Sequence, residues 1–212
     1  MDSRGAESFP SAAFPNYPSL ARETVNEGEL VRAAQRGDEA ALESLYRAHY
    51  DQVYRYLLFR TGNPTVAEDI ACQVFLAVVR GLSRYRHGDK PFLAWLYGIA
   101  RNQLAQFYRE SARRPQNGAY YAPLNGEAEP VDEDGGPAED LERREQRERL
   151  SLALAGLPDP QREVVLLRSL LDLSIVETAE LVGKSEGAVK QLHRRGLSSL
   201  RTRLEALLPD SP

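Results

Sequence analysis

Residues 173–203 constrain the fold most, because their order predicts two helices joined by a tight turn. Apolar residues recur at helical spacing across 175–182, and Gly183 follows where a helix can end with positive φ. Ser185, two residues later, is a strong N-cap for a second helix. We expect the second helix to point five apolar side chains inward: Val189, Leu192, Leu197, Leu200 and Leu204. This pattern is typical of a helix-turn-helix motif.

The second helix of this motif is basic, although the whole chain has a formal net charge of -4. Between residues 184 and 203, Glu186 is the only acid, whereas the cations are Lys184, Lys190, Arg194, Arg195, Arg201 and Arg203. Such a local excess favours phosphate as a partner. We therefore expect residues near the start of this helix to contact duplex DNA: Ser185, Glu186, Gly187, Lys190, Gln191, Arg194 and Arg195. A solvated basic helix that only packs on a neighbour is the alternative.

A second informative segment, residues 91–114, mixes aromatic, amide and cationic side chains in one expected helix. Its proline at 91 suits a helix start, and Phe92, Trp95 and Leu96 are expected in the core. Cations bind a nucleic-acid backbone, and aromatic rings stack on unpaired bases at roughly 1–3 kcal/mol per base. With the basic loop before it, the segment predicts single-strand contacts by Tyr85, His87, Tyr97, Arg101, Asn102, Tyr108 and Arg109. An ordinary core helix ending in arginines is the alternative.

Three more helices are expected between residues 27 and 80, and the third carries an acidic and polar patch. Thr65 and Glu68 have the spacing of a capping box that opens this helix. The patch consists of Glu68, Asp69 and Gln73, which either bind a partner or only complement the helix dipole. Cys72, in the same helix, is expected to be a small buried residue.

Two segments of biased composition divide the chain of 212 residues. Residues 1–26 are rich in Ser, Pro, Ala and Gly, which predicts a disordered N-terminal arm. Residues 115–140 contain no Lys or Arg but many acids, which predicts an acidic flexible linker. We therefore expect an all-α protein with two small helical domains, at 27–114 and 141–208.

Several classes of protein are disfavoured by the composition. The chain has no run of about 18 apolar residues, so membrane insertion is not expected. A secretory signal is absent and the single cysteine cannot form an internal disulfide, which favours a cytoplasmic protein. The three histidines and Cys72 lack metal-ligand spacing, and neither a phosphate-binding loop nor a nucleophile elbow occurs. We expect no metal, no cofactor and no enzymatic activity.

Together, several segments resemble a known family. They are EDIACQVFLAVVR at 68–80, FLAWLYGIARNQLAQFYR at 92–109, and LPDPQREVVLLR at 157–168 followed by VETAELVGKSEGAVKQLHRR at 176–195. In this order they are similar to bacterial RNA polymerase sigma factors of the sigma-70 family, in the extracytoplasmic-function (ECF) group. The resemblance implies a sigma-2-like helical bundle and a sigma-4-like helix-turn-helix domain. It departs from the common pattern at Cys72, 176–178 and 191–192, which bears on the promoter sequence.

The resemblance also implies a role for each candidate group. The patch at residues 68, 69 and 73 would dock on the clamp helices of the largest polymerase subunit. The loop at 83–90 and the following helix would open minus-10 promoter DNA and hold an extruded base. The helix-turn-helix would read duplex minus-35 DNA and sit on the polymerase flap, with the acidic linker threaded toward the RNA path. An anti-sigma factor is a further candidate partner.

A free-standing helix-turn-helix regulator is the competing hypothesis. It explains residues 141–208, but it leaves the aromatic and basic helix and the acidic linker without a use. A sigma factor should bind promoter DNA well only with core polymerase, whereas a regulator should bind unaided.

Overall fold

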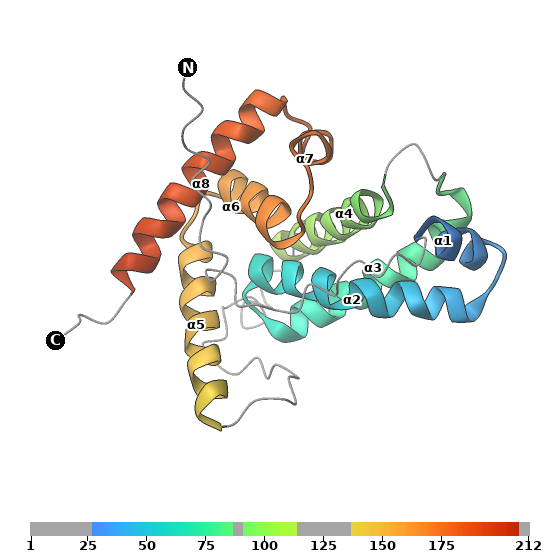
Figure 1. Cartoon of the computed structure of the whole chain (residues 1–212), viewed down its shortest axis with the longest axis horizontal. Coiled ribbons are helices and arrows are strands. Elements are labelled where there is room, and N and C mark those ends of the chain that lie inside the picture. Colours follow the sequence, from blue (N-terminus) through green and yellow to red (C-terminus); the bar gives the residue numbers. More distant parts are fainter. Residues whose placement is uncertain (1–26, 87–90, 114–136, 208–212) are drawn as a thin grey trace, which may run out of the picture.

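The computed structural model describes residues 27–86, 91–113 and 137–207, and within these ranges every regular element is helical (Figure 1). The expected all-α fold is therefore confirmed. The N-terminal arm, His87 and most of the acidic linker lie outside the described residues.

The first half of the protein is a bundle of four helices. These are α1 (Glu27–Gln35), α2 (Glu39–Thr61), α3 (Pro64–Gly81) and α4 (Phe92–Arg113), with a 3-10 turn, η2 (Leu82–Arg84), after α3. Helix α2 packs against α1 and α3, and α3 packs against α4. Side chains such as Val31, Leu57, Val74 and Leu96 are buried between them. Helices α3 and α4 therefore pack on the same apolar core.

Helix α3 begins differently from the sequence-based prediction. Asn63 is the N-cap and its side chain accepts a hydrogen bond from the Val66 amide at 3.2 Å, while Pro64 occupies the first turn. The predicted capping box of Thr65 and Glu68 is therefore wrong, because Asn63 already satisfies a free amide of this turn. Cys72 is exposed, so its predicted burial is wrong as well.

The second half contains the predicted helix-turn-helix. Its elements are α5 (Pro137–Ala155), α6 (Asp159–Val165), a π turn η4 (Leu166–Leu170), α7 (Ile175–Val182) and α8 (Glu186–Ala206). Helices α6 and α8 pack against each other at Gly196, where an added Cβ would lie 2.6 Å from Cγ2 of Val165. Glycine at this position lets the two helices approach closely. Helix α5 begins at Pro137, four residues before the expected start of this domain.

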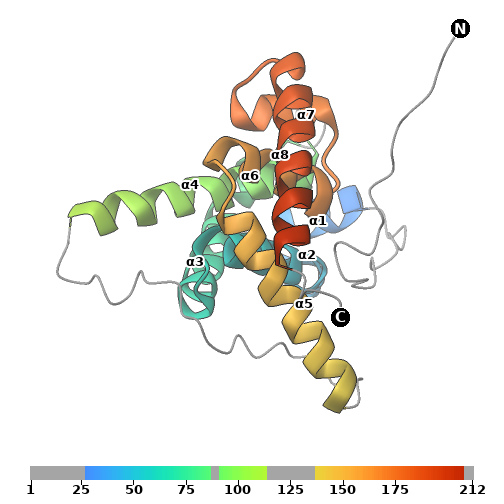
Figure 2. The same ribbon diagram turned by 90° about the vertical axis from the view of Figure 1, so that its left-hand side faces the viewer.

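The two halves meet along a seam formed by α2 and α4 on one side and α5, η4 and α7 on the other. Figure 1 shows α6 and α7 beside α4, and Figure 2 shows the first part of α5 extending away from the other helices. Buried side chains of both halves, including Leu57 and Leu166, belong to one hydrophobic cluster. At the α4–α7 contact, a Cβ built on Gly98 would lie 3.7 Å from Cδ1 of Leu181. Side-chain packing therefore holds the two halves together, in addition to the chain that connects them.

Candidate nucleic-acid and polymerase interface

Capping interactions stabilise both ends of α7 and the start of α8. Gly183 has φ 66°, which ends α7 in the left-handed conformation, and Ser185 accepts a hydrogen bond from the Ala188 amide at 3.3 Å. Both features agree with the prediction. Sequence reasoning missed a reciprocal capping box at the start of α7: the Ser174 amide donates to Glu177 at 2.7 Å, and the Glu177 amide donates to Ser174 Oγ at 3.2 Å. The signal was present, as S-x-x-E, in the sequence.

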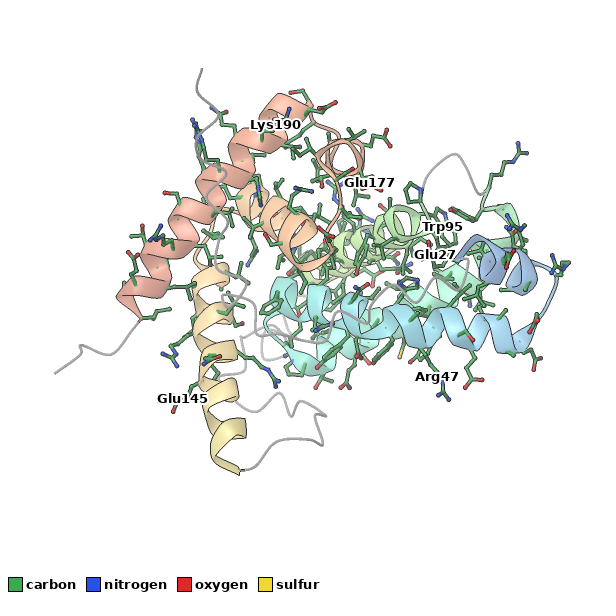
Figure 3. All side chains as sticks on the ribbon, in the orientation of Figure 1. Glu27, Arg47, Trp95, Glu145, Glu177 and Lys190 are labelled. Atoms are coloured by element: carbon green, nitrogen blue, oxygen red, sulfur yellow. The ribbon has the colours of Figure 1, made fainter. Side chains whose placement is uncertain are left out.

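The predicted outer face of α8 is confirmed as exposed. All seven candidate residues, Ser185, Glu186, Gly187, Lys190, Gln191, Arg194 and Arg195, are exposed. Val189 and Leu200 are buried on the opposite side of the helix. Figure 3 places Lys190 near the outer end of α8, away from the α1–α4 bundle. Lys190 Nζ lies 3.9 Å from Glu186 in a solvent-exposed pair, which leaves both side chains able to turn toward a duplex.

Two aromatic candidates for strand contact are not on the surface. Tyr97 is 0% exposed and packs edge-on against Tyr56, with ring centroids 5.7 Å apart. Tyr85 is 6% exposed and packs against Phe92 and Trp95. The predicted surface positions of Tyr97 and Tyr85 are therefore wrong. Helix α4 contacts α2, α3 and α7, so more of its circumference is buried than the single apolar stripe in its sequence predicts.

The other described candidates are all on α4, and three of them, Arg101, Tyr108 and Arg109, line one hollow. Asn102 and Arg109 are exposed, while the Tyr108 hydroxyl donates to the Arg60 carbonyl at 2.8 Å. Arg101 donates a hydrogen bond to the Leu181 carbonyl of α7. Arg101 and its neighbours line a hollow of about 490 Å³ whose polar or charged residues are Arg60, Arg101, Tyr108, Arg109, Asp159, Glu163 and Lys184.

A buried charge cluster at this hollow was not anticipated from the sequence. Glu163 of α6 has a side chain only 9% exposed, and its Oε2 lies 2.8 Å from Arg60 Nη1. Its Oε1 accepts a hydrogen bond from the Tyr56 hydroxyl at 3.0 Å and lies 3.5 Å from Arg101 Nε. Burial, together with the charge of Glu163, raises the pKa of Tyr56 well above its ordinary value, so Tyr56 is a neutral donor. Arg60 also reaches Asp159 at 3.1 Å.

The acidic and polar patch on α3 is exposed as predicted: Glu68, Asp69 and Gln73 all face solvent. Apolar groups that the sequence did not single out lie on the same part of the bundle. Leu76 is 47% exposed, and the exposed Tyr46 of α2 contacts Phe75 with ring centroids 4.7 Å apart. A surface that combines acids with exposed apolar groups suits protein binding.

Two negative findings apply to the described residues. Among them, no group of three or more His, Cys, Asp or Glu side chains is arranged to hold a metal ion. Within the same ranges, no helix has the length and apolar character needed to cross a membrane.

The fold and the exposed basic face of α8 define an all-α protein with a helix-turn-helix of the DNA-binding kind. Residues 45–114 match Sigma-70 region 2, and residues 147–200 match Sigma-70, region 4. The chain is 34% identical over 193 residues to the ECF RNA polymerase sigma factor SigD of Mycobacterium tuberculosis, covering 89% of each protein. It is also 35% identical over 183 residues to the ECF sigma factor BldN of Streptomyces coelicolor, covering 86% of this chain and 66% of BldN. The chain belongs to the ECF RNA polymerase sigma factors.

Solved structures show the same fold. A chain in the structure of CnrH in complex with the cytosolic domain of CnrY matches with a TM-score of 0.62 and 22% identity, covering 86% of this chain and 99% of that one. A chain in the complex of the sigma factor RpoE with the anti-sigma factor NepR from Bartonella quintana also has a TM-score of 0.62, with 18% identity. That match covers 78% of this chain and 98% of the other.

Proposed function

We propose that this protein binds core RNA polymerase and directs it to promoters, where it takes part in DNA melting and transcription initiation. The observation that carries this proposal is the presence of both sigma-70 regions in one chain, with a capped, basic helix-turn-helix in the second. A free-standing regulator needs only the second region. The matching relatives are themselves named ECF RNA polymerase sigma factors.

Within this function we assign a separate task to each surface. The exposed residues at the start of α8 would read duplex minus-35 DNA, and Arg101, Asn102, Tyr108 and Arg109 of α4 would contact the minus-10 strand. The patch of Glu68, Asp69 and Gln73 would dock on the clamp helices of the largest polymerase subunit. The helix-turn-helix domain would also sit on the polymerase flap.

We further propose an anti-sigma factor as a regulatory partner, because CnrY and NepR accompany the matched chains in the solved complexes. The protein would act where its polymerase acts, in the cytoplasm. It would contribute binding and positioning rather than catalysis, since the polymerase carries out the chemistry.

Promoter binding in the presence and absence of core polymerase tests the proposal. We expect promoter-length duplex DNA to be bound specifically by the mixture of this protein and core polymerase, and weakly by the protein alone. Electrophoretic mobility shifts at a fixed salt concentration measure this, since salt sets non-specific affinity. Equal, specific binding without polymerase would favour the free-standing regulator.

Reversing the charges of Glu68 and Asp69 to lysine should weaken polymerase binding. Both side chains are exposed, so the fold should be unaffected, while the new cations should be repelled by a basic partner surface. Fluorescence anisotropy with core polymerase measures the affinity. The matched control is the same reversal at Glu43 and Asp51, two exposed acids of α2. Unchanged affinity for the α3 variant, or an equal loss in the control, contradicts the assignment.

Replacing Asn102 with alanine should slow promoter opening while closed-complex binding stays nearly intact. Asn102 is exposed on α4, and its amide can hydrogen-bond a base only after that base has left the stack. Permanganate reactivity of unpaired thymines measures opening on duplex DNA, and a premelted bubble template should rescue the variant. Gln106→Ala, one turn further along α4 and bonded to Glu110, is the control. Normal opening by the Asn102 variant rules out this contact.

A further inference from the structure

The last residue of α1, Gln35, binds the turn that follows α3. Its side-chain Nε2 donates a hydrogen bond to the Leu82 carbonyl at 2.9 Å and another to the Tyr85 carbonyl at 2.7 Å. A glutamine amide has two N–H donors, so both are used on this one turn. The short helix α1 is thereby tied to η2, and Figure 1 shows α1 beside the end of α3 where this turn lies.

Turn η2 is a weak element by itself. It has three residues, no side chain caps its start, and the Tyr85 amide closes it on the Leu82 carbonyl at 3.1 Å. A 3-10 turn also has poorer hydrogen-bond geometry than an α-helix. Gln35 adds a second donor to the Leu82 carbonyl, which has two lone pairs to accept with. Part of the order of this turn is therefore supplied by α1.

The ring of Tyr85 fixes the same turn to α4. Its centroid lies 5.7 Å from that of Phe92 and 5.0 Å from that of Trp95, both at the start of α4. Gly81 allows close packing here, since an added Cβ would lie 3.3 Å from Cζ2 of Trp95. Tyr85 is thus held through its carbonyl by Gln35 and through its ring by α4. This buried tyrosine is an anchor for the turn.

Two exposed cations flank the anchored tyrosine. Arg84 and Arg86 face solvent on either side of the buried Tyr85, and among the described residues neither has an ion-pair partner. Residues seven positions apart in a helix share one face, about 10 Å apart along the axis, so Asn102 lies on the same side of α4 as Trp95. The turn and Asn102 therefore offer cations and an amide on one side of α4.

We propose that Gln35 is a positioning residue for promoter opening, because it holds η2 so that Arg84 and Arg86 bind phosphates of the minus-10 strand. Asn102 then meets a base of the strand that these cations hold. The inference rests on the proposed contact of α4 with that strand. Gln35 acts through the turn and does not itself touch DNA. Helix α1 precedes the match to Sigma-70 region 2, which begins at residue 45, so this role is additional to those of the matched region.

The rate of promoter opening by the full-length protein with core polymerase tests this role. Gln35→Met keeps the length of the side chain but has no N–H donor, and Arg84→Ala/Arg86→Ala removes the two cations. Each variant should slow opening of duplex DNA about tenfold, since hydrogen bonds to charged groups are among the stronger ones. A fluorescent base analogue in the minus-10 element reports the rate. Gln52→Met, at a half-buried glutamine of α2, is the control and should open DNA normally.

A premelted bubble template separates positioning from loss of folded protein. Complexes on this template should form normally with Gln35→Met, because the opening step is bypassed, whereas an unfolded protein would fail on both templates. Normal opening of duplex DNA by Gln35→Met overturns the proposal, and so does a failure on both templates. Normal opening by Arg84→Ala/Arg86→Ala shows instead that this turn does not contact the strand, so the two failures are distinguishable.

Combining the changes tests whether Gln35 acts through the two cations. The variant Gln35→Met/Arg84→Ala/Arg86→Ala should open DNA no more slowly than Arg84→Ala/Arg86→Ala, because residues that act as one unit are not additive. A purely structural loss would add to the loss of the cations. Multiplied effects on the opening rate therefore contradict the positioning role.

Restoring a donor at position 35 provides a second, independent test. Gln35→Lys carries three N–H donors and should recover most of the rate that Gln35→Met loses, whereas Gln35→Glu, which has no donor when ionised, should not. Gln35→Met/Ala40→Lys adds the same charge at an exposed position of α2 and should stay slow, which excludes a general effect of charge. A rate for Gln35→Lys as low as that for Gln35→Met overturns the proposal.

Discussion

Replacing Tyr97 with alanine is expected to lower the free energy of unfolding by about 3–5 kcal/mol, as for other large aromatic residues in cores. Tyr97 is 0% exposed and lies against Tyr56, so the truncation leaves a cavity between α4 and α2. Urea denaturation followed by circular dichroism measures the loss. Promoter opening should fall only because less protein is folded.

Tyr97→Phe is the matched control for this prediction. Among the described residues, the Tyr97 hydroxyl has no hydrogen-bond partner, and burial raises the pKa of the tyrosine well above its ordinary value. Removing a buried, unsatisfied hydroxyl should leave stability unchanged or slightly increased. If Tyr97→Phe instead blocks promoter opening at unchanged stability, the hydroxyl must reach DNA in a conformation other than this one.

The second large effect is expected at the recognition helix. Lys190→Ala and Arg194→Ala should each weaken minus-35 binding of the polymerase complex by roughly 1–3 kcal/mol if they contact bases. The double variant should lose the sum if the two contacts are independent. Both side chains are exposed near the start of α8, so stability should hardly change. Competition between matched and mutated minus-35 duplexes distinguishes two kinds of contact. Loss of a base contact should reduce the preference for the matched sequence, whereas loss of a phosphate contact should weaken binding to both duplexes equally.

Arg201→Ala provides the control on the same helix. Arg201 is also an exposed cation, but it lies in the second half of α8 and pairs with Glu205 at 3.2 Å. Its loss should lower affinity slightly and equally for all sequences. If the Lys190 and Arg194 variants behave like Arg201→Ala, the face of α8 assigned to the major groove is incorrect.

Local sequence signals predicted the helix-turn-helix accurately. The bounds of α7, the positive φ at Gly183 and the cap at Ser185 depend on side chains within a few residues of each other, so the sequence contains all their determinants. The exposure of the candidate residues on α8 and α3 was predicted from the helical spacing of the apolar residues on the opposite face. The start of α3 was predicted incorrectly because two possible N-caps, Asn63 and Thr65, lie within three residues of each other.

Features that depend on tertiary packing were not predictable in this way. Tyr97 was placed on the surface because a helical stripe does not reveal how many neighbours cover α4. Tyr85 was placed there because it follows the 3-10 turn η2, and the loop sequence does not show that its ring packs on Phe92 and Trp95. Cys72 was placed inside because its apolar neighbours belong to a face that ends just before it. The contact between Tyr56 and Glu163 joins residues 107 positions apart, and no local pattern encodes such a pairing.

The close approach of α6 and α8 at Gly196 has a consequence for protein engineering. Because a Cβ there would lie 2.6 Å from Val165 Cγ2 and 3.3 Å from the Gln161 carbonyl, Gly196 fixes how deeply α8 is seated on α6. A designer who wishes to retarget the protein to another promoter should therefore graft only the solvent-facing positions at 185–195 and keep Gly196. Exchanging the whole of α8 for a foreign helix with a side chain at this point would tilt the recognition surface and shift the half-site it can reach.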